Sequence, residues 1–159
     1  MASEALETYL NDHLAGATLG SDHAHQLKDM TEGTPLGVVM QRIAADIDED
    51  RDELQALMER LNISENPVKK AGAWVMEKAG RVKFSGASAG DKDYGVYMTL
   101  ETMSLGVAGK LALWEALLSV KESDPVLAQT DLDRLAARAR EQRATLESER
   151  VALAQRVFA

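Results

Sequence analysis

The hydrophobic positions between residues 35 and 61 follow the period of a helix. Apolar side chains recur there at steps of three and four residues, which places them on one side of an α-helix. The positions on this side are Leu36, Val39, Met40, Ile43, Ile47, Asp50, Leu54, Leu57, Met58 and Leu61. One member of the set, Asp50, is a carboxylate. The pattern therefore predicts an acid on the inner face of a long helix, and the main functional question is what that acid contacts.

Three further stretches show the same period. They predict long helices at about residues 4–30, 94–121 and 125–158, in addition to 35–61. Typical helix-start residues precede several of them, namely Ser3, Thr34 before Pro35, and Asp124 before Pro125. In the last helix the predicted inner face is Leu132, Leu135, Ala139, Gln142, Leu146, Glu149, Leu153 and Val157. In the third helix, a row of small residues (Ser104, Gly106, Ala108, Gly109 and Ala112) suggests close contact with another helix.

The lengths of the connections predict how these helices are arranged. A break of about four residues between the first two helices, with Gly33 in it and Asn62 as the stop of the second, implies an antiparallel hairpin. Pairing about a turn at residues 32–33 would set His13 near residue 52, beside the acidic centre. The next connection is about 30 residues long and contains a predicted short helix at about 67–79, so we expect it to cross from one end of a bundle to the other. No segment shows the alternation of a strand.

Composition limits the class of protein. The 159 residues fit one domain, residues 1–159, and the lack of cysteine excludes disulfides, thiolate metal sites and a cysteine nucleophile. The net charge of −8 argues against nucleic acid or an anionic membrane as the partner. Residues 1–65 carry 14 acids and 4 bases (−10) and residues 66–159 carry 12 acids and 14 bases (+2), so the two parts should attract each other within one fold or between copies. No apolar run is long enough to span a bilayer, and we expect a cytoplasmic protein.

In length, helix order and the long crossover between helices two and three, the chain resembles the ferritin-like four-helix-bundle superfamily. The resemblance covers nearly the whole chain and implies an all-α, up-down four-helix bundle with the short extra helix in its crossover. The metal centre of the superfamily uses a Glu from each of two helices and a Glu-x-x-His from each of the other two. This sequence contains no Glu-x-x-His, and its three histidines all lie in the first 25 residues. It therefore resembles a divergent, bacterial-type member without the usual ligands.

A reduced metal site is one interpretation of the inner carboxylates. If the four inner faces align, His13, Asp50, Glu53, Glu101 and Glu149 would converge on a mixed nitrogen and oxygen site suited to iron, manganese or zinc. The other interpretation is structural: His13 pairs with Asp50, while Glu101 and Glu149 meet Lys110, Arg143 or Arg150. A buried carboxylate requires a partner in both cases.

Two functions follow from these interpretations. The first is a ferritin-like protein without a complete di-metal centre, which acts as a structural or self-association module and forms a homo-oligomer. This version is not an enzyme and needs no cofactor. The second is a ferritin-like protein with a reduced histidine and carboxylate site for iron or manganese, in metal handling or stress protection.

Overall fold

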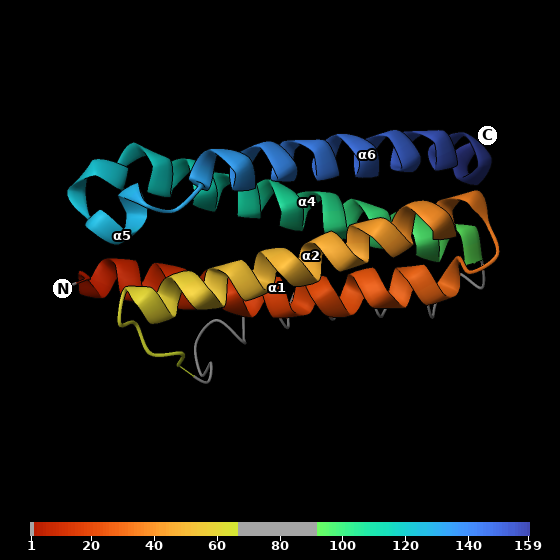
Figure 1. The fold of residues 1–159 in the computed structure, drawn as a ribbon. Coiled ribbons are helices and arrows are strands. Elements are labelled where there is room, and N and C mark those ends of the chain that lie inside the picture. Colours follow the sequence, from red (N-terminus) through yellow and green to blue (C-terminus); the bar gives the residue numbers. More distant parts are fainter. Residues whose placement is uncertain (1, 67–91) are drawn as a thin grey trace.

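The computed structural model describes residues 2–66 and 92–159, and this part of the chain is all-helical (Figure 1). Four long helices pack side by side: α1 (Glu4–Met30), α2 (Pro35–Arg60), α4 (Lys92–Ser119) and α6 (Leu132–Phe158). A 3₁₀ turn, η1 (Lys121–Ser123), and a short helix, α5 (Pro125–Ala128), join α4 to α6. The prediction of an all-α chain with four long helices is confirmed. The short helix predicted at about 67–79 lies outside the described residues.

The ends of α1 and α2 follow the start and stop signals of the sequence. The Ser3 hydroxyl caps α1, and the Thr34 hydroxyl caps α2 with Pro35 at its first position. In the turn between them Gly33 has a φ of +77°, and Asn62 ends α2 with a φ of +56°. Both are left-handed conformations that glycine and asparagine adopt more readily than other residues. The predicted hairpin is therefore confirmed at its turn and at its end.

The last predicted helix is interrupted. Residues 125–158 were expected to form one helix, but the structure has a break between α5 and α6. The carboxylates of Asp124 and Asp131 each accept a hydrogen bond from a backbone N–H of the turn that follows, at 2.8 and 3.1 Å. Because each acid satisfies the free N–H groups of a new helix start, the chain begins a helix twice. The prediction of one continuous helix was wrong at its first turn.

The side-chain contacts establish the direction of the helices. Along α6, later residues bond earlier residues of α2 and of α4. On α2, Glu53 meets Arg134 and Asp50 meets Arg138; on α4, Glu115 meets Arg140 and Glu101 meets Arg150. Both α2 and α4 are therefore antiparallel to α6 and parallel to each other. The end of α2 and the start of α4 consequently lie at opposite ends of the bundle, as the long predicted crossover requires (Figure 1).

All four long helices contribute to one continuous core. On α2, eight of the ten predicted inner positions are buried, and Leu36 and Val39 at its start are partly exposed. On α6, six of the eight predicted inner positions are buried, and Glu149 and Val157 are partly exposed. The pairs α4 with α6 and α1 with α2 pack over most of their lengths, and α1 also packs on α4. The helical period thus identified the core correctly.

The small residues of α4 do not all have the close neighbour that the sequence suggested. Ser104 is buried, but Gly106 and Ala112 are exposed. A Cβ built at Gly106 or Gly109 would have nothing within 4 Å. No helix in the described ranges therefore approaches these positions closely. Although α4 is rich in apolar residues, neither it nor another described helix is apolar enough over sufficient length to cross a membrane.

Candidate functional site

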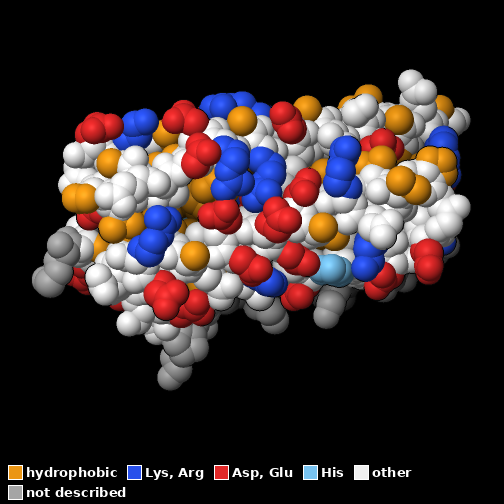
Figure 2. All heavy atoms as spheres, in the orientation of Figure 1, with side chains coloured by type: hydrophobic (Ala, Val, Ile, Leu, Met, Phe, Trp, Pro, Cys, Tyr) orange, Lys and Arg blue, Asp and Glu red, His pale blue; other side chains and the backbone are white. Residues whose placement is uncertain are grey.

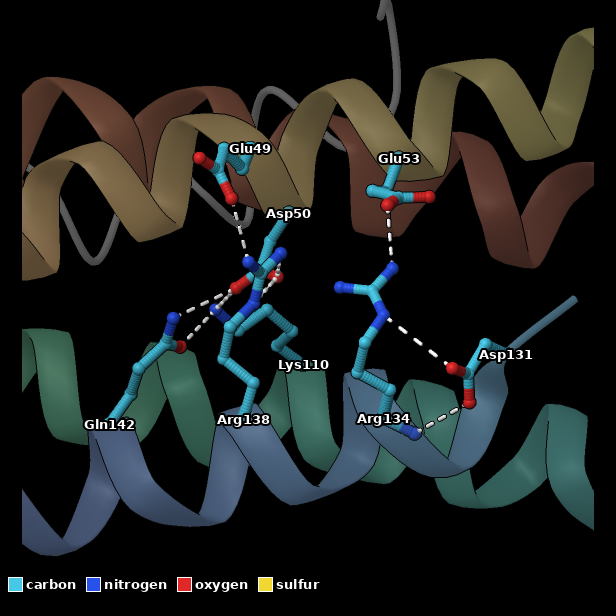
Figure 3. Close-up of polar contacts among 8 residues, drawn as sticks. All are labelled: Glu49, Asp50, Glu53, Lys110, Asp131, Arg134, Arg138 and Gln142. Carbon is cyan, nitrogen blue, oxygen red and sulfur yellow. Dashed lines mark hydrogen bonds and ion pairs between the residues drawn. The ribbon is translucent and has the colours of Figure 1, made fainter.

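Asp50 lies at the middle of α2, and its side chain is 2% exposed. Both of its oxygens accept from protein donors (Figure 3). Oδ1 accepts from Arg138 Nε at 2.8 Å, and Oδ2 accepts from Gln142 Nε2 at 3.0 Å and from Lys110 Nζ. Arg138 Nη2 also contacts Oδ1 as an ion pair, although its geometry is not that of a hydrogen bond. The buried acid of the sequence pattern is thus the centre of a polar cluster from three helices.

The partners of Asp50 are also bonded to one another. Lys110 Nζ donates to Gln142 Oε1 at 2.5 Å, and Arg138 Nη1 donates to the exposed Glu49 at 2.8 Å. With two acids and two bases, this Asp50 cluster (Glu49, Asp50, Lys110, Arg138 and Gln142) has no net charge. Burial lowers the pKa of the Lys110 ammonium, and the charge of Asp50 opposes this effect only in part. For Arg138, burial lowers the pKa, but the charges and hydrogen bonds of Asp50 and Glu49 together outweigh burial and raise it.

This arrangement determines what the cluster can do chemically. A carboxylate that binds a metal must offer it a lone pair, but of the roughly four acceptor sites of Asp50 three accept from an ammonium, a guanidinium and an amide, and Arg138 Nη2 also lies against Oδ1. A cation entering there would have to displace Lys110 and Arg138, and so would meet two like charges. Instead, the cluster joins α2, α4 and α6 through hydrogen bonds that a shift of one helical turn, about 5.4 Å, would break.

Glu53, another predicted ligand, lies one turn from Asp50 at the surface between α2 and α6. It accepts from Arg134 Nη2 at 2.7 Å, and Arg134 also pairs with Asp131 (Figure 3). Acidic and basic side chains are intermixed along this face of the bundle (Figure 2). The predicted attraction between the acidic first part and the more basic second part thus operates within the fold.

His13 does not lie beside Asp50, contrary to the hairpin estimate. It is half-buried on α1 with its ring 4.5 Å from that of Tyr9, and burial lowers its pKa. Two residues away, Asn11 bonds the backbone of Ser64, beyond the end of α2, so His13 lies about 15 Å along the bundle from Asp50. Part of the displacement arises at the turn, where Gly37, not residue 34, lies against Thr31, a shift of three residues.

Glu101 and Glu149 lie on other parts of the surface. Glu101 accepts from Arg150 Nη1 at 3.4 Å and from the Tyr97 hydroxyl at 3.3 Å. Arg150 is one of the three bases that the structural interpretation offered for Glu101 and Glu149. Glu149 is partly exposed on α6. Within residues 2–66 and 92–159, no three histidine or acidic side chains lie close enough together to hold a metal ion. The five predicted ligands therefore occupy separate environments.

A second ionic group links α4 and α6 near Glu101. Glu147 accepts from the Ser104 hydroxyl and from Arg150 Nη2 at 2.8 Å. The hydrogen bonds of Arg150, and then of Ser104, lower the pKa of Glu147 from 4.5 to about 2. Because the folded pKa is the lower one, the contribution of Glu147 to stability is complete above pH 4.5 and is lost as the pH falls through about 2.

We therefore expect Glu147→Gln to lower the free energy of unfolding at pH 7 and to have progressively less effect down to pH 2. Urea unfolding of both proteins across this range measures the difference. Glu141→Gln, at an exposed glutamate of the same helix, is the control and should show no such trend. An equal loss from Glu147→Gln at pH 7 and pH 2 would contradict the assignment.

A serine, an aspartate and a histidine meet between α1 and α2, but not in the order of a catalytic triad. The buried Ser21 hydroxyl donates to Asp48 Oδ1 at 2.5 Å, and His25 Nε2 contacts Asp48 Oδ2 at 2.8 Å. In a triad the imidazole bonds the serine and removes its proton. Here Asp48 lies between the two, so His25 cannot act as the base for Ser21. The group links the two helices.

The sequence identified Asp50 but not its partners. Lys110 was expected to meet Glu101 or Glu149, Gln142 was recognised only as an inner position, and Arg138 was not singled out. One available signal was Lys110 itself, a single cation within an otherwise apolar stretch of α4. Another was the spacing of Arg138 and Gln142, which lie one turn apart on α6.

Comparison of the chain with protein-family models, with curated proteins and with solved structures found no match.

Proposed function

We propose that this protein is a ferritin-like bundle without a di-metal centre, and that it acts as a structural and self-associating interaction module rather than as an enzyme. The observation that carries the proposal is the Asp50 cluster. Lys110 and Arg138 supply at Asp50 the positive charge that a metal ion would otherwise supply. The inward-facing acid is thus used to join helices.

Two further observations support this function. Two hollows of the described surface are open to solvent: one lies at the α1–α2 turn, between Lys28 and Gln41, and the other lies beside Asp52 and Glu59. Neither contains members of the Asp50 cluster, so neither gives a substrate access to its buried polar groups. By contrast, α4 presents an apolar face to solvent, with Leu105 64% exposed. An exposed apolar face is a feature of proteins that bind other proteins.

Metal analysis tests the proposal against the alternative of an iron or manganese site. Protein purified without chelators or affinity metals should contain only substoichiometric iron, manganese and zinc. Its melting temperature should not change with added Fe²⁺ or Mn²⁺, because a ligand stabilises only a folded state that binds it. Stoichiometric metal that is lost in a His13→Ala, Asp50→Ala double variant would overturn the proposal. If that variant does not fold, Glu53→Gln and Glu101→Gln provide the same comparison at exposed predicted ligands.

A further inference from the structure

Helix α4 differs from the other long helices in having apolar residues around its whole circumference. A surface helix normally has one apolar side and one charged side, and a helix that is apolar all round is normally buried. The outward face of α4 is nevertheless open, with Leu105 64% exposed. Each charged residue between Tyr94 and Ser119 is held in an ion pair: Lys110 by Asp50, Glu101 by Arg150 and Glu115 by Arg140. The remaining outward face carries no charge.

The open residues of α4 form a regular seam. They recur at alternating steps of four and three, the spacing of two helices that pack along their length. The seam consists of Met98, Thr102, Leu105, Gly109, Ala112 and Ala116, all exposed or partly exposed. The Thr102 hydroxyl donates to the Met98 carbonyl at 2.9 Å, so Thr102 has no unmet donor to bury. We call these six residues the α4 seam.

The first half of the α4 seam holds its larger residues, Met98, Thr102 and Leu105, and the second half holds its smaller ones. If a second copy packs antiparallel about a two-fold axis at the level of residue 107, every larger residue of one copy faces a smaller residue of the other. The facing pairs are Met98 with Ala116, Thr102 with Ala112, and Leu105 with Gly109, and each pair is centred on residue 107. A Cβ built at Gly109 meets nothing within 4 Å, so Leu105 of a second copy has space there. A surface that is complementary to itself is what a two-fold dimer requires.

The charges beside the α4 seam are also compatible with a second copy. Glu101 and Glu115 lie on the same side of α4 and pair with Arg150 and Arg140 of α6 at 3.4 and 2.7 Å. In the dimer, the two-fold axis places this side of α4 next to the same side of α4 in the other copy. The Glu101–Arg150 pair of one copy then lies beside the Glu115–Arg140 pair of the other. Two acids and two bases from each copy alternate there, so like charges do not need to face each other unpaired.

Resting on the proposed self-association, we propose that two copies of this chain form an antiparallel dimer through the α4 seam. The 28 residues of α4 span about 42 Å, and a contact about 10 Å wide buries roughly 400 Å² per copy. Stable dimers of ordinary size bury about 800 Å² per copy. The contact is therefore about half the size of an ordinary stable one, and the dimer is weak and forms at high protein concentration.

Sedimentation equilibrium from about 5 µM to 500 µM should show a reversible monomer–dimer equilibrium. Leu105→Glu places a charge in the α4 seam and should raise the dissociation constant about 100-fold or more. Val38→Glu is the matched control, because Val38 is 72% exposed on α2, outside the seam, and it should leave the constant unchanged. Circular dichroism melts establish that both variants are folded.

The direction of pairing is tested by cross-linking, since the chain has no cysteine of its own. Met98→Cys and Ala116→Cys chains, mixed under mild oxidation, should form the mixed disulfide, and neither variant should form much disulfide alone. A self-linked Met98→Cys dimer would overturn the antiparallel arrangement. A dimer equally sensitive to Leu105→Glu and Val38→Glu would overturn the α4 seam but leave self-association standing. A chain that stays monomeric up to about 500 µM would overturn both.

Discussion

The Asp50→Ala variant is expected to lose about 3–5 kcal/mol of unfolding free energy. The substitution leaves Lys110 and Arg138, whose side chains are only 15% and 18% exposed, opposite each other without their shared carboxylate, and removing one partner of a largely buried ion pair has a cost of this size. Because a whole domain is stable by only about 5–15 kcal/mol, the denaturation midpoint should fall steeply. Urea unfolding followed by circular dichroism at neutral pH measures the loss.

The control for Asp50→Ala is Glu53→Ala, one turn further along α2. The Glu53–Arg134 pair spans the same two helices at 2.7 Å, but its side chains are 39% and 47% exposed. An exposed pair contributes at most about 1 kcal/mol, so the control should remain close to the parent protein. Equal losses from the two substitutions would show that the burial of Asp50 is not what matters.

A combined variant tests whether the Asp50 cluster stabilises the fold or instead fixes which residues of the three helices meet. Replacing Asp50 and Gln142 with Leu and both Lys110 and Arg138 with Met removes the central charges together with the buried amide that bonds them, and leaves apolar groups in their place. Replacements of a whole buried cluster are often neutral or stabilising. We therefore expect urea unfolding of this fourfold variant to show that it recovers much of what Asp50→Ala loses. The role of the cluster is then to fix the register of the helices.

The helical period predicted the fold well because burial follows it closely. On α2 the inner stripe from Met40 to Leu61 is buried as expected, and local caps such as Ser3 and Thr34 acted where the sequence placed them. The errors arose where two local signals compete. Both Asp124 and Asp131 can start a helix, and periodicity alone does not show that the chain uses both.

The partners of Asp50 were harder to predict because they depend on the register between helices. A displacement of one helical turn shifts a neighbour by about 5.4 Å, which is enough to exchange one ion-pair partner for another. The estimate for His13 failed in this way, since it assumed that the hairpin pairs residues evenly about its turn. Glu101 and Arg150 were easier, because long side chains at a surface reach a partner over a wider range of registers.

The second large effect is expected at the contact between Gly37 and Thr31 in the α1–α2 turn. The Gly37→Ala variant should lose about 2–4 kcal/mol of unfolding free energy. A Cβ at this position would lie 2.2 Å from the carbonyl oxygen of Thr31, which is backbone and cannot rotate away. That oxygen also accepts from the Thr34 N–H at 3.1 Å and from the Thr34 hydroxyl at 2.6 Å. Moving it would break these bonds in addition to overpacking the turn, so both costs add to the loss.

Gly20→Ala on α1 is the matched control for Gly37→Ala and should have the opposite sign. Nothing lies within 4 Å of a Cβ built at Gly20, and alanine inside a helix is more favourable than glycine by about 0.5–1 kcal/mol. Urea unfolding of the two variants should therefore place the parent protein between them. If Gly37→Ala were as stable as Gly20→Ala, the close approach of α2 to the end of α1 would be wrong. The pairing of α1 with α2 would then have to be set elsewhere in the hairpin, for example where Ser21 and His25 contact Asp48.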